Sequence, residues 1–155
     1  MIKVLLDTTY LLPTFGISVE GLTEKHLIEL RQLRLKKHVE YYCIDIIWIE
    51  LLGKIYKEQK KRRKNIDAYL DLGIKALKST DFYKWITVPP DALILAFKIR
   101  KLGHKDQIDN VLYATAKVNN MIFLTMDNEF KKFLTEKGFD TQILKDHTGL
   151  IDSLT

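Results

Sequence analysis

Cysteine is almost absent from this 155-residue chain, which contains a single copy, Cys43. One cysteine cannot form an internal disulfide framework or supply a zinc cluster, so both kinds of stabilised small domain are excluded. Cys43 lies in an apolar run, and we interpret it as a buried side chain rather than a nucleophile. The low cysteine content agrees with a reducing compartment, and we expect the protein in the cytoplasm.

Long hydrophobic runs are also missing. The longest apolar stretch, residues 44–52, is interrupted by Asp45 and Glu50 and is too short to cross a bilayer. At the N-terminus, Asp7 comes too early for the apolar region of a signal peptide. We therefore expect a soluble protein that makes no membrane contact.

Linker-like sequence is scarce, because the chain has only three prolines and seven glycines and shows no repeat or low-complexity tract. A chain of 155 residues can bury a substantial core. Its apolar share of 46% and charged share of 29% are ordinary for a globular protein. We expect one folded domain over residues 1–155.

Short apolar runs alternate with segments of helical spacing along the chain. Strands are predicted at residues 4–6, 41–44, 85–88 and 121–124, and residues 141–144 could form a fifth. Helices are predicted from about residue 9, at 23–37, 46–61, 66–77 and 90–102, from Asp106 onward, and at 128–137. This alternation indicates an α/β fold, with a parallel sheet of four or five strands covered on both faces.

Acidic residues come at the points where these elements change. Asp7 directly follows the first strand, Asp127 comes just after the fourth, and Asp106 and Asp109 open a helix. In open parallel sheets, ligands bind outside the carboxyl ends of the strands, where the N-termini of the following helices also lie. Acids from distant parts of the sequence could therefore meet on one rim of the sheet.

Each of these acids also has a purely structural interpretation. Asp7, Asp106 and Asp127 could cap the helices that follow them. Asp109 could be an acid favoured in a first helical turn by the helix dipole. Taken one at a time, the structural interpretation is about as good as the functional one.

Glu50 is harder to explain structurally, because residues 46–52 are otherwise apolar and indicate a helix that is buried nearly all round. A carboxylate there is costly unless a cation or hydrogen-bond donors compensate it. A salt bridge to a lysine is the structural alternative to a metal ion.

Several carboxylates on one rim suit a hard cation such as Mg²⁺ or Mn²⁺, which prefers oxygen ligands. Such an ion keeps bound waters, accepts phosphate oxygens and can activate an attacking water. Thr8 and Thr125 flank the acids and could hydrogen-bond a carboxylate or a metal-bound water.

Four segments resemble the motifs of PIN-domain nucleases. Residues 4–12, which read Val-Leu-Leu-Asp-Thr-Thr-Tyr-Leu-Leu, resemble the family's opening strand and first acid, Asp7. Glu50 matches the second acid, on the helix after the second strand. Residues 109–116 resemble the helix of the third acid, Asp109, and residues 125–130 resemble the closing motif with Asp127. Each motif alone is loose, but four in order along almost the whole chain are more specific.

The resemblance implies a three-layer α/β/α sandwich and Mg²⁺- or Mn²⁺-dependent cleavage of RNA. The catalytic and metal-binding residues it implies are Asp7, Glu50, Asp109 and Asp127, with Asp106 as a further candidate ligand. It also implies a homodimer. A lone domain of this length is most similar to VapC-type toxins, whose protein antitoxin blocks the site. An RNA-processing nuclease and a catalytically inactive PIN-like module that binds RNA or protein remain alternatives.

Positive charge elsewhere in the chain favours an anionic partner, since the formal net charge is +5. The basic run, defined here as Lys60, Lys61, Arg62 and Arg63, could follow an RNA backbone through phosphate contacts. A solvated helix end is the alternative interpretation of this run. Lys105, beside Asp106, is better placed to contact a phosphate near the metal ion.

Overall fold

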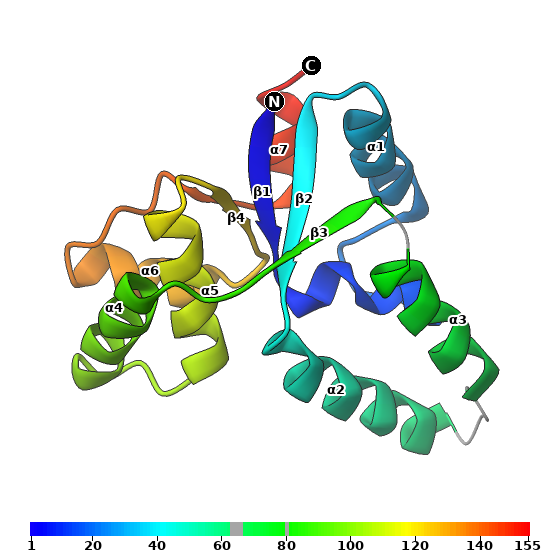
Figure 1. Cartoon of the computed structure of the whole chain (residues 1–155), viewed down its shortest axis with the longest axis horizontal. Coiled ribbons are helices and arrows are strands. Elements are labelled where there is room, and N and C mark those ends of the chain that lie inside the picture. The colour runs from blue at the N-terminus through cyan, green and yellow to red at the C-terminus, as the bar shows by residue number, and fades with distance from the viewer. Residues whose placement is uncertain (63–66, 80) are drawn as a thin grey trace.

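A computed structural model describes residues 1–62, 67–79 and 81–155 (Figure 1). The strands are β1 (Ile2–Leu6), β2 (Val39–Ile44), β3 (Tyr83–Ile86), β4 (Ile122–Leu124) and β5 (Leu144–Lys145). The α-helices are α1 (Glu24–Leu35), α2 (Ile47–Arg62), α3 (Asp67–Lys78), α4 (Pro90–Lys101), α5 (Gln107–Val118), α6 (Asn128–Glu136) and α7 (His147–Asp152). Arg63 of the basic run and residue 66 of the helix predicted at 66–77 lie outside the described residues.

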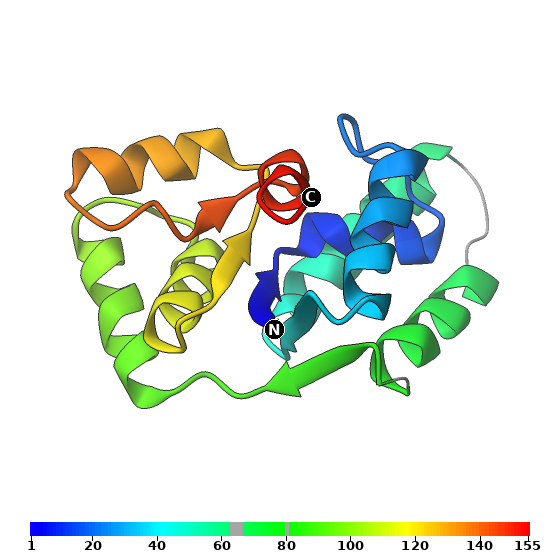
Figure 2. The ribbon, with the colours of Figure 1, turned by 90° about the horizontal axis from the view of Figure 1, so that it is seen from above.

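All five strands form one parallel sheet in the order β3-β2-β1-β4-β5. In Figures 1 and 2, α4 and α5 lie on one side of the sheet, and α1 and α7 lie together on the other. The predicted α/β/α architecture is therefore confirmed, with five strands. No helix in the described part of the chain has the length and apolar character needed to cross a bilayer.

The central strand β1 is where the core and the candidate acids meet. Val4 and Leu5 are fully buried and Leu6 is nearly so. They pair with β2 on one side and β4 on the other, for example Val4 with both Tyr41 and Ile122. Because Asp7 directly follows this strand, its position is fixed by pairing on both sides.

The helix predicted from about residue 9 is wrong. Two short 3₁₀ segments, η1 (Thr8–Tyr10) and η2 (Leu12–Phe15), follow β1 instead. Pro13 is the second residue of η2, and a proline cannot donate the hydrogen bond that a continuous helix needs there. Gly16 ends the segment in the left-handed region, at φ 74°.

Two predicted strands are displaced along the chain. β3 starts at Tyr83, two residues before the predicted 85–88, because Tyr83 and Lys84 pair with Tyr41 and Tyr42 of β2. β5 is Leu144–Lys145 rather than 141–144. The sequence analysis missed α7, whose first turn is capped by the Asp146 side chain through the backbone N–H of Gly149.

Helix α3 packs on η2 through a glycine. Gly73 and Leu77 are its buried residues, and a Cβ atom at Gly73 would overlap the ring of Phe15. Phe15 is 1% exposed, so its ring lies within the packed core. The glycine thus permits the close approach of these two segments.

This packing predicts opposite effects for two Gly→Ala substitutions within helices. Gly73→Ala should lower the free energy of unfolding by about 1–3 kcal/mol, because the added methyl overpacks against Phe15. Gly53→Ala in α2, where nothing lies within 4 Å of the new Cβ, should raise it by about 0.5–1 kcal/mol through helix propensity. Urea denaturation measures both, and equal gains would show that α3 does not pack on Phe15 in this way.

Candidate active site

Asp7 is held at the end of β1 by hydrogen bonds to both of its carboxylate oxygens. Oδ1 accepts from the backbone N–H of Thr8 at 2.7 Å, and Oδ2 accepts from the Thr125 hydroxyl at 2.9 Å. The residue is 6% exposed. Burial raises the pKa of Asp7 above its ordinary value, while the Thr125 hydrogen bond and the nearby charge of Lys54 oppose that rise.

Glu50 lies in the first turn of α2, and its side chain contacts Thr8, the residue next to Asp7. Its Oε1 accepts a hydrogen bond from the Thr8 hydroxyl at 2.9 Å and lies 2.5 Å from the Lys54 ammonium. Lys54 also donates to the Thr8 Oγ1 at 3.1 Å. Glu50 Oε2 is buried, and no partner for it is found among the described residues.

The prediction that the helix around Glu50 is buried nearly all round is wrong. Ile49 is 74% exposed and Leu52 is 44% exposed. Apolar composition did not reveal which side of α2 faces the protein, and only the side that includes Ile47, Leu51 and Ile55 is buried. The salt bridge to a lysine, considered as the alternative for Glu50, is present in the structure as the pair with Lys54.

Asp109 is the acid with the least compensation. It lies in the first turn of α5 and is 8% exposed. No donor in the described part of the chain hydrogen-bonds its carboxylate. Burial first, and then the charges of Asp7, Asp106, Asp127 and Glu50, raise the pKa of Asp109 to about 8. These five acids, which we call the carboxylate cluster, are therefore close enough to act on one another.

Asp7 caps the 3₁₀ segment η1, and two other members of the cluster cap α-helices, as the structural interpretation proposed. Asp106 Oδ1 accepts from the backbone N–H groups of Ile108 and Asp109, at 3.0 and 3.1 Å. Asp127 Oδ1 accepts from Phe130 N–H at 2.9 Å. In each carboxylate these capping bonds use one oxygen, so capping leaves the other oxygen free for a different role.

The donor chemistry of the cluster fits a hard divalent cation, since it consists of carboxylate and hydroxyl oxygens. The uncompensated Asp109 and the unpartnered Oε2 of Glu50 are the groups that a cation would stabilise. Within residues 1–62, 67–79 and 81–155, however, no three histidine, cysteine or acidic side chains converge closely enough to hold an ion as they stand. Side-chain rearrangement would have to accompany cation binding.

The other predicted contact residues divide into two groups. Thr8 and Thr125 are buried within the cluster. Lys60, Lys61 and Arg62 lie in the last turn of α2, roughly 15 Å along the helix axis from Glu50 at 1.5 Å per residue. Arg62 pairs there with Glu58 at 3.2 Å, and Arg63 lies outside the described residues. Lys105 is exposed in the loop before α5.

Three lysines near the cluster were not singled out by the sequence analysis. Lys54 contacts Glu50, and its i,i+4 spacing from that acid was the available signal. Lys131 and Lys145 line a hollow of about 210 Å³ together with Thr125 and Asp127. No pattern in the sequence indicates that Lys145 and Asp127 come together, because strand pairing brings β5 beside β4.

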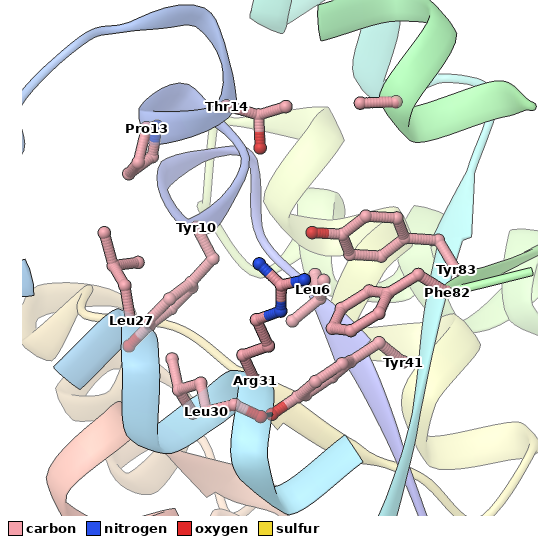
Figure 3. Close-up of a pocket in the computed structure, with 11 residues that line it drawn as sticks. Leu6, Tyr10, Pro13, Thr14, Leu27, Leu30, Arg31, Tyr41, Phe82 and Tyr83 are labelled. Atoms are coloured by element: carbon pink, nitrogen blue, oxygen red, sulfur yellow. Dashed lines mark hydrogen bonds between the residues drawn. The ribbon is translucent and has the colours of Figure 1, made fainter. Parts of the chain in front are cut away.

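A separate cavity of about 530 Å³ lies between η2, α1 and the strands β2 and β3. Figure 3 shows the Arg31 side chain reaching into it among the rings of Tyr10, Tyr41, Phe82 and Tyr83. None of the five clustered acids lines this cavity. The carboxylate cluster and this aromatic cavity are therefore different sites.

The raised pKa of Asp109 predicts how pH affects stability. A carboxyl whose folded-state pKa is raised adds stability that is full at low pH and is lost as pH rises towards about 8. In EDTA, Asp109→Asn should match the native protein at pH 4. At pH 9 it should be more stable by on the order of 2 kcal/mol. Urea denaturation across this range checks the difference.

The comparison variant is Asp127→Asn, which should gain less because it also loses a favourable charge at the N-terminus of α6. Equal pH dependence in the Asp109→Asn variant and the native protein would contradict the crowding of charge around Asp109.

Comparison with known proteins places the chain in a family. A profile of the PIN domain matches residues 4–134. The fold is similar to VapBC2 from Rickettsia felis, solved bound to a DNA fragment from its promoter (TM-score 0.61, 16% identity, covering 94% of this chain and 98% of that one). It is also similar to PAE2754 from Pyrobaculum aerophilum (TM-score 0.66, 17% identity, covering 99% and 89%). Comparison with curated protein sequences gives no match. The chain belongs to the PIN-domain family, whose members are generally nucleases.

Proposed function

We propose that this protein is a metal-dependent endoribonuclease that hydrolyses phosphodiester bonds in RNA. The catalytic and metal-binding residues in this proposal are Asp7, Glu50, Asp109 and Asp127, with Asp106 as an additional ligand. The observation that supports it best is the pKa of Asp109, raised to about 8 by burial and by four neighbouring acids. A buried group of acids with so little compensation marks a functional site more often than a structural one.

The side chains of the cluster have separable roles in this reaction. Mg²⁺ or Mn²⁺ held by these acids would supply an activated water and would stabilise the charge on the leaving oxygen. Thr8 and Thr125 fix the orientation of the Asp7 carboxylate, so that it presents its oxygens in one direction. Asp109 enters the first turn of α5 without a hydrogen-bond donor of its own among the described residues, which leaves its oxygens free to bind a cation.

The RNA strand would be bound by lysines around this centre. Lys131 and Lys145 border the hollow beside Asp127, and Lys105 lies in the loop before α5. Phosphate contacts of this kind hold a strand in register without choosing its sequence. The net charge of +5 supports the same class of substrate.

The fold likeness to VapBC2 supports a more specific proposal. In it, the protein is the toxin of a toxin–antitoxin pair, acts in the cytoplasm as a homodimer of one domain per chain, and is inhibited by a protein antitoxin. A neighbouring small reading frame whose product binds the protein and blocks RNA cleavage would establish this pairing. An RNA-processing nuclease would show no such inhibitor.

One observation favours a second candidate, an inactive PIN-like module that binds RNA or protein. Lys54 already neutralises part of the charge of Glu50, and Asp106 and Asp127 cap helices. A module of this kind would bind its partner without a divalent cation. Cation-dependent cleavage therefore separates the two candidates.

The nuclease proposal predicts cation-dependent RNA cleavage by the purified protein. Activity should require Mg²⁺ or Mn²⁺ and disappear in EDTA. Asp7→Asn should reduce the rate by at least about a hundredfold, the order of effect expected when a charge-stabilising group is removed. Asp71→Asn, an exposed acid on α3 paired with Lys75, is the matched control and should cut normally. Undiminished cleavage by the Asp7→Asn protein would refute the mechanism.

A second prediction concerns the basic run at the end of α2. Replacing Lys60, Lys61, Arg62 and Arg63 by glutamine should weaken RNA binding and reduce its salt dependence. The log–log slope should fall by about 0.7 for each phosphate of a single strand that these side chains neutralise in the native protein. Single-turnover cleavage at saturating RNA should stay largely intact, because Lys60, Lys61 and Arg62 lie in the last turn of α2, away from Glu50 in its first turn. Binding measured at several salt concentrations gives the slope.

The comparison variant carries Lys131→Gln and Lys145→Gln. It should lower the salt slope and also slow cleavage at saturation, because these lysines border the hollow beside Asp127. An unchanged slope in the α2 variant would mean that the basic run is a solvated helix end and that RNA follows another path.

A further inference from the structure

Lys54 is the cation that the fold itself supplies to the carboxylate cluster. It lies one helical turn after Glu50 on α2, and its ammonium is 2.5 Å from Glu50 Oε1. It also donates to Thr8 Oγ1 at 3.1 Å, and that hydroxyl lies 3.3 Å from Asp7 Oδ1. One ammonium thus contacts the hydroxyl that joins two of the proposed catalytic acids.

Among the ion pairs in the described part of the chain, the Lys54–Glu50 pair alone includes an acid of the carboxylate cluster. The other pairs involve acids outside the cluster, such as Lys75 with Asp71 and Lys117 with Asp140. The Glu50 side chain is 18% exposed and that of Lys54 39%, so the pair is partly shielded from water and from salt. Its interaction is therefore stronger than that of a fully exposed pair.

The two oxygens of Glu50 have different surroundings. Oε1 is bound by Lys54 and Thr8, whereas Oε2 is buried and has no partner in the described residues. Asp109, at 8% exposed, likewise has no donor there. Lys54 therefore compensates the side of the cluster formed by Glu50 and Asp7, and among the described residues no lysine or arginine pairs with Asp109.

We infer that Lys54 is a resident counter-ion that competes with the divalent cation for Glu50. This inference rests on the proposed function, because it concerns the same cation site. A divalent ion bound to Glu50 would face the ammonium at close range, and two positive charges a few ångströms apart repel strongly. In this inference the repulsion makes Lys54 leave Oε1 when the ion binds Glu50 through Oε2, which lacks a partner among the described residues.

If Lys54 competes with the cation, removing Lys54 should lower the stability of the cation-free protein and raise its affinity for the cation. Without a cation, the protein loses the charge that matches Glu50 and becomes less stable. With a cation, the competitor is gone and the ion binds more tightly. A lysine with only a structural role would lower stability without tightening cation binding, and a lysine that only binds RNA would change neither.

The experiment compares Lys54→Met with Lys57→Met, an exposed lysine one turn further along the same helix. Mn²⁺ affinity is measured by titration calorimetry in the absence of RNA, and melting temperature is measured in EDTA. Lys54→Met should bind Mn²⁺ at least about threefold more tightly, a small part of the repulsion expected between neighbouring charges, and should melt lower in EDTA. Lys57→Met should match the native protein in both measurements.

A double-variant cycle ties the effect to Glu50. In a Glu50→Gln background the carboxylate that Lys54 occupies is gone, so adding Lys54→Met should change Mn²⁺ affinity much less than it does in the native background. An equal gain in both backgrounds would mean that Lys54 repels the ion through the general field and does not compete for Glu50, which overturns the inference.

A measurement on the native side chain avoids dependence on whether the Met variant folds. The NMR signal of the Lys54 ε-methylene, assigned with Lys54→Arg, should shift in step with Mg²⁺ saturation as the ammonium leaves Glu50. Mg²⁺ binding without that shift would overturn the inference, and so would Mn²⁺ affinity that is no higher in Lys54→Met. In either case, RNA cleavage by the native protein would leave the proposed function standing. A native protein that neither binds Mn²⁺ nor cuts RNA would overturn both.

Discussion

Burial of the Asp7 carboxylate at the end of the central strand is the constraint that the neighbouring residues must satisfy. Pairing of β1 with β2 and β4 on its two sides fixes the backbone that leads into Asp7, and the residue is 6% exposed. A buried carboxylate needs hydrogen-bond donors or positive charge. The backbone of Thr8 and the hydroxyl of Thr125 provide the donors, and Lys54 provides the charge. The residues around the end of β1 are therefore arranged to stabilise the buried Asp7 carboxylate.

Structural and functional interpretations of the acids turn out to be compatible. Asp106 and Asp127 cap α5 and α6, and each does so through a single oxygen. Capping fixes the direction of the carboxylate and ties it to a helix N-terminus, where the dipole favours negative charge. The cap therefore reduces the energy needed to hold an acid close to other acids. A capping bond at this rim is no argument against a role in cation binding.

The sequence predicted most of the sheet because buried parallel strands are short apolar runs, and it located the rim because acids follow two of them. It failed where tertiary contacts decide. A helix was predicted from about residue 9, but this stretch contains Pro13 and forms two 3₁₀ segments. Ile49 and Leu52 are apolar and exposed, since composition does not show which side of a helix is covered. Lys54 was not singled out, because one lysine among many carries no signal until the helical turn that brings it to Glu50 is known.

Charge crowding at the rim is smaller than the five formal charges suggest. A pKa of about 8 keeps Asp109 largely protonated near neutral pH, and Lys54 offsets Glu50. Cation binding to carboxylates requires their ionised form, so a divalent ion entering here would release the Asp109 proton. Under the competition inferred for Lys54, it would also displace that ammonium. The ion would then replace two units of positive charge with its own two, so the net charge of the rim would remain nearly constant. Such an exchange would let the folded protein tolerate these acids when no cation is bound, and the same acids could still bind a cation.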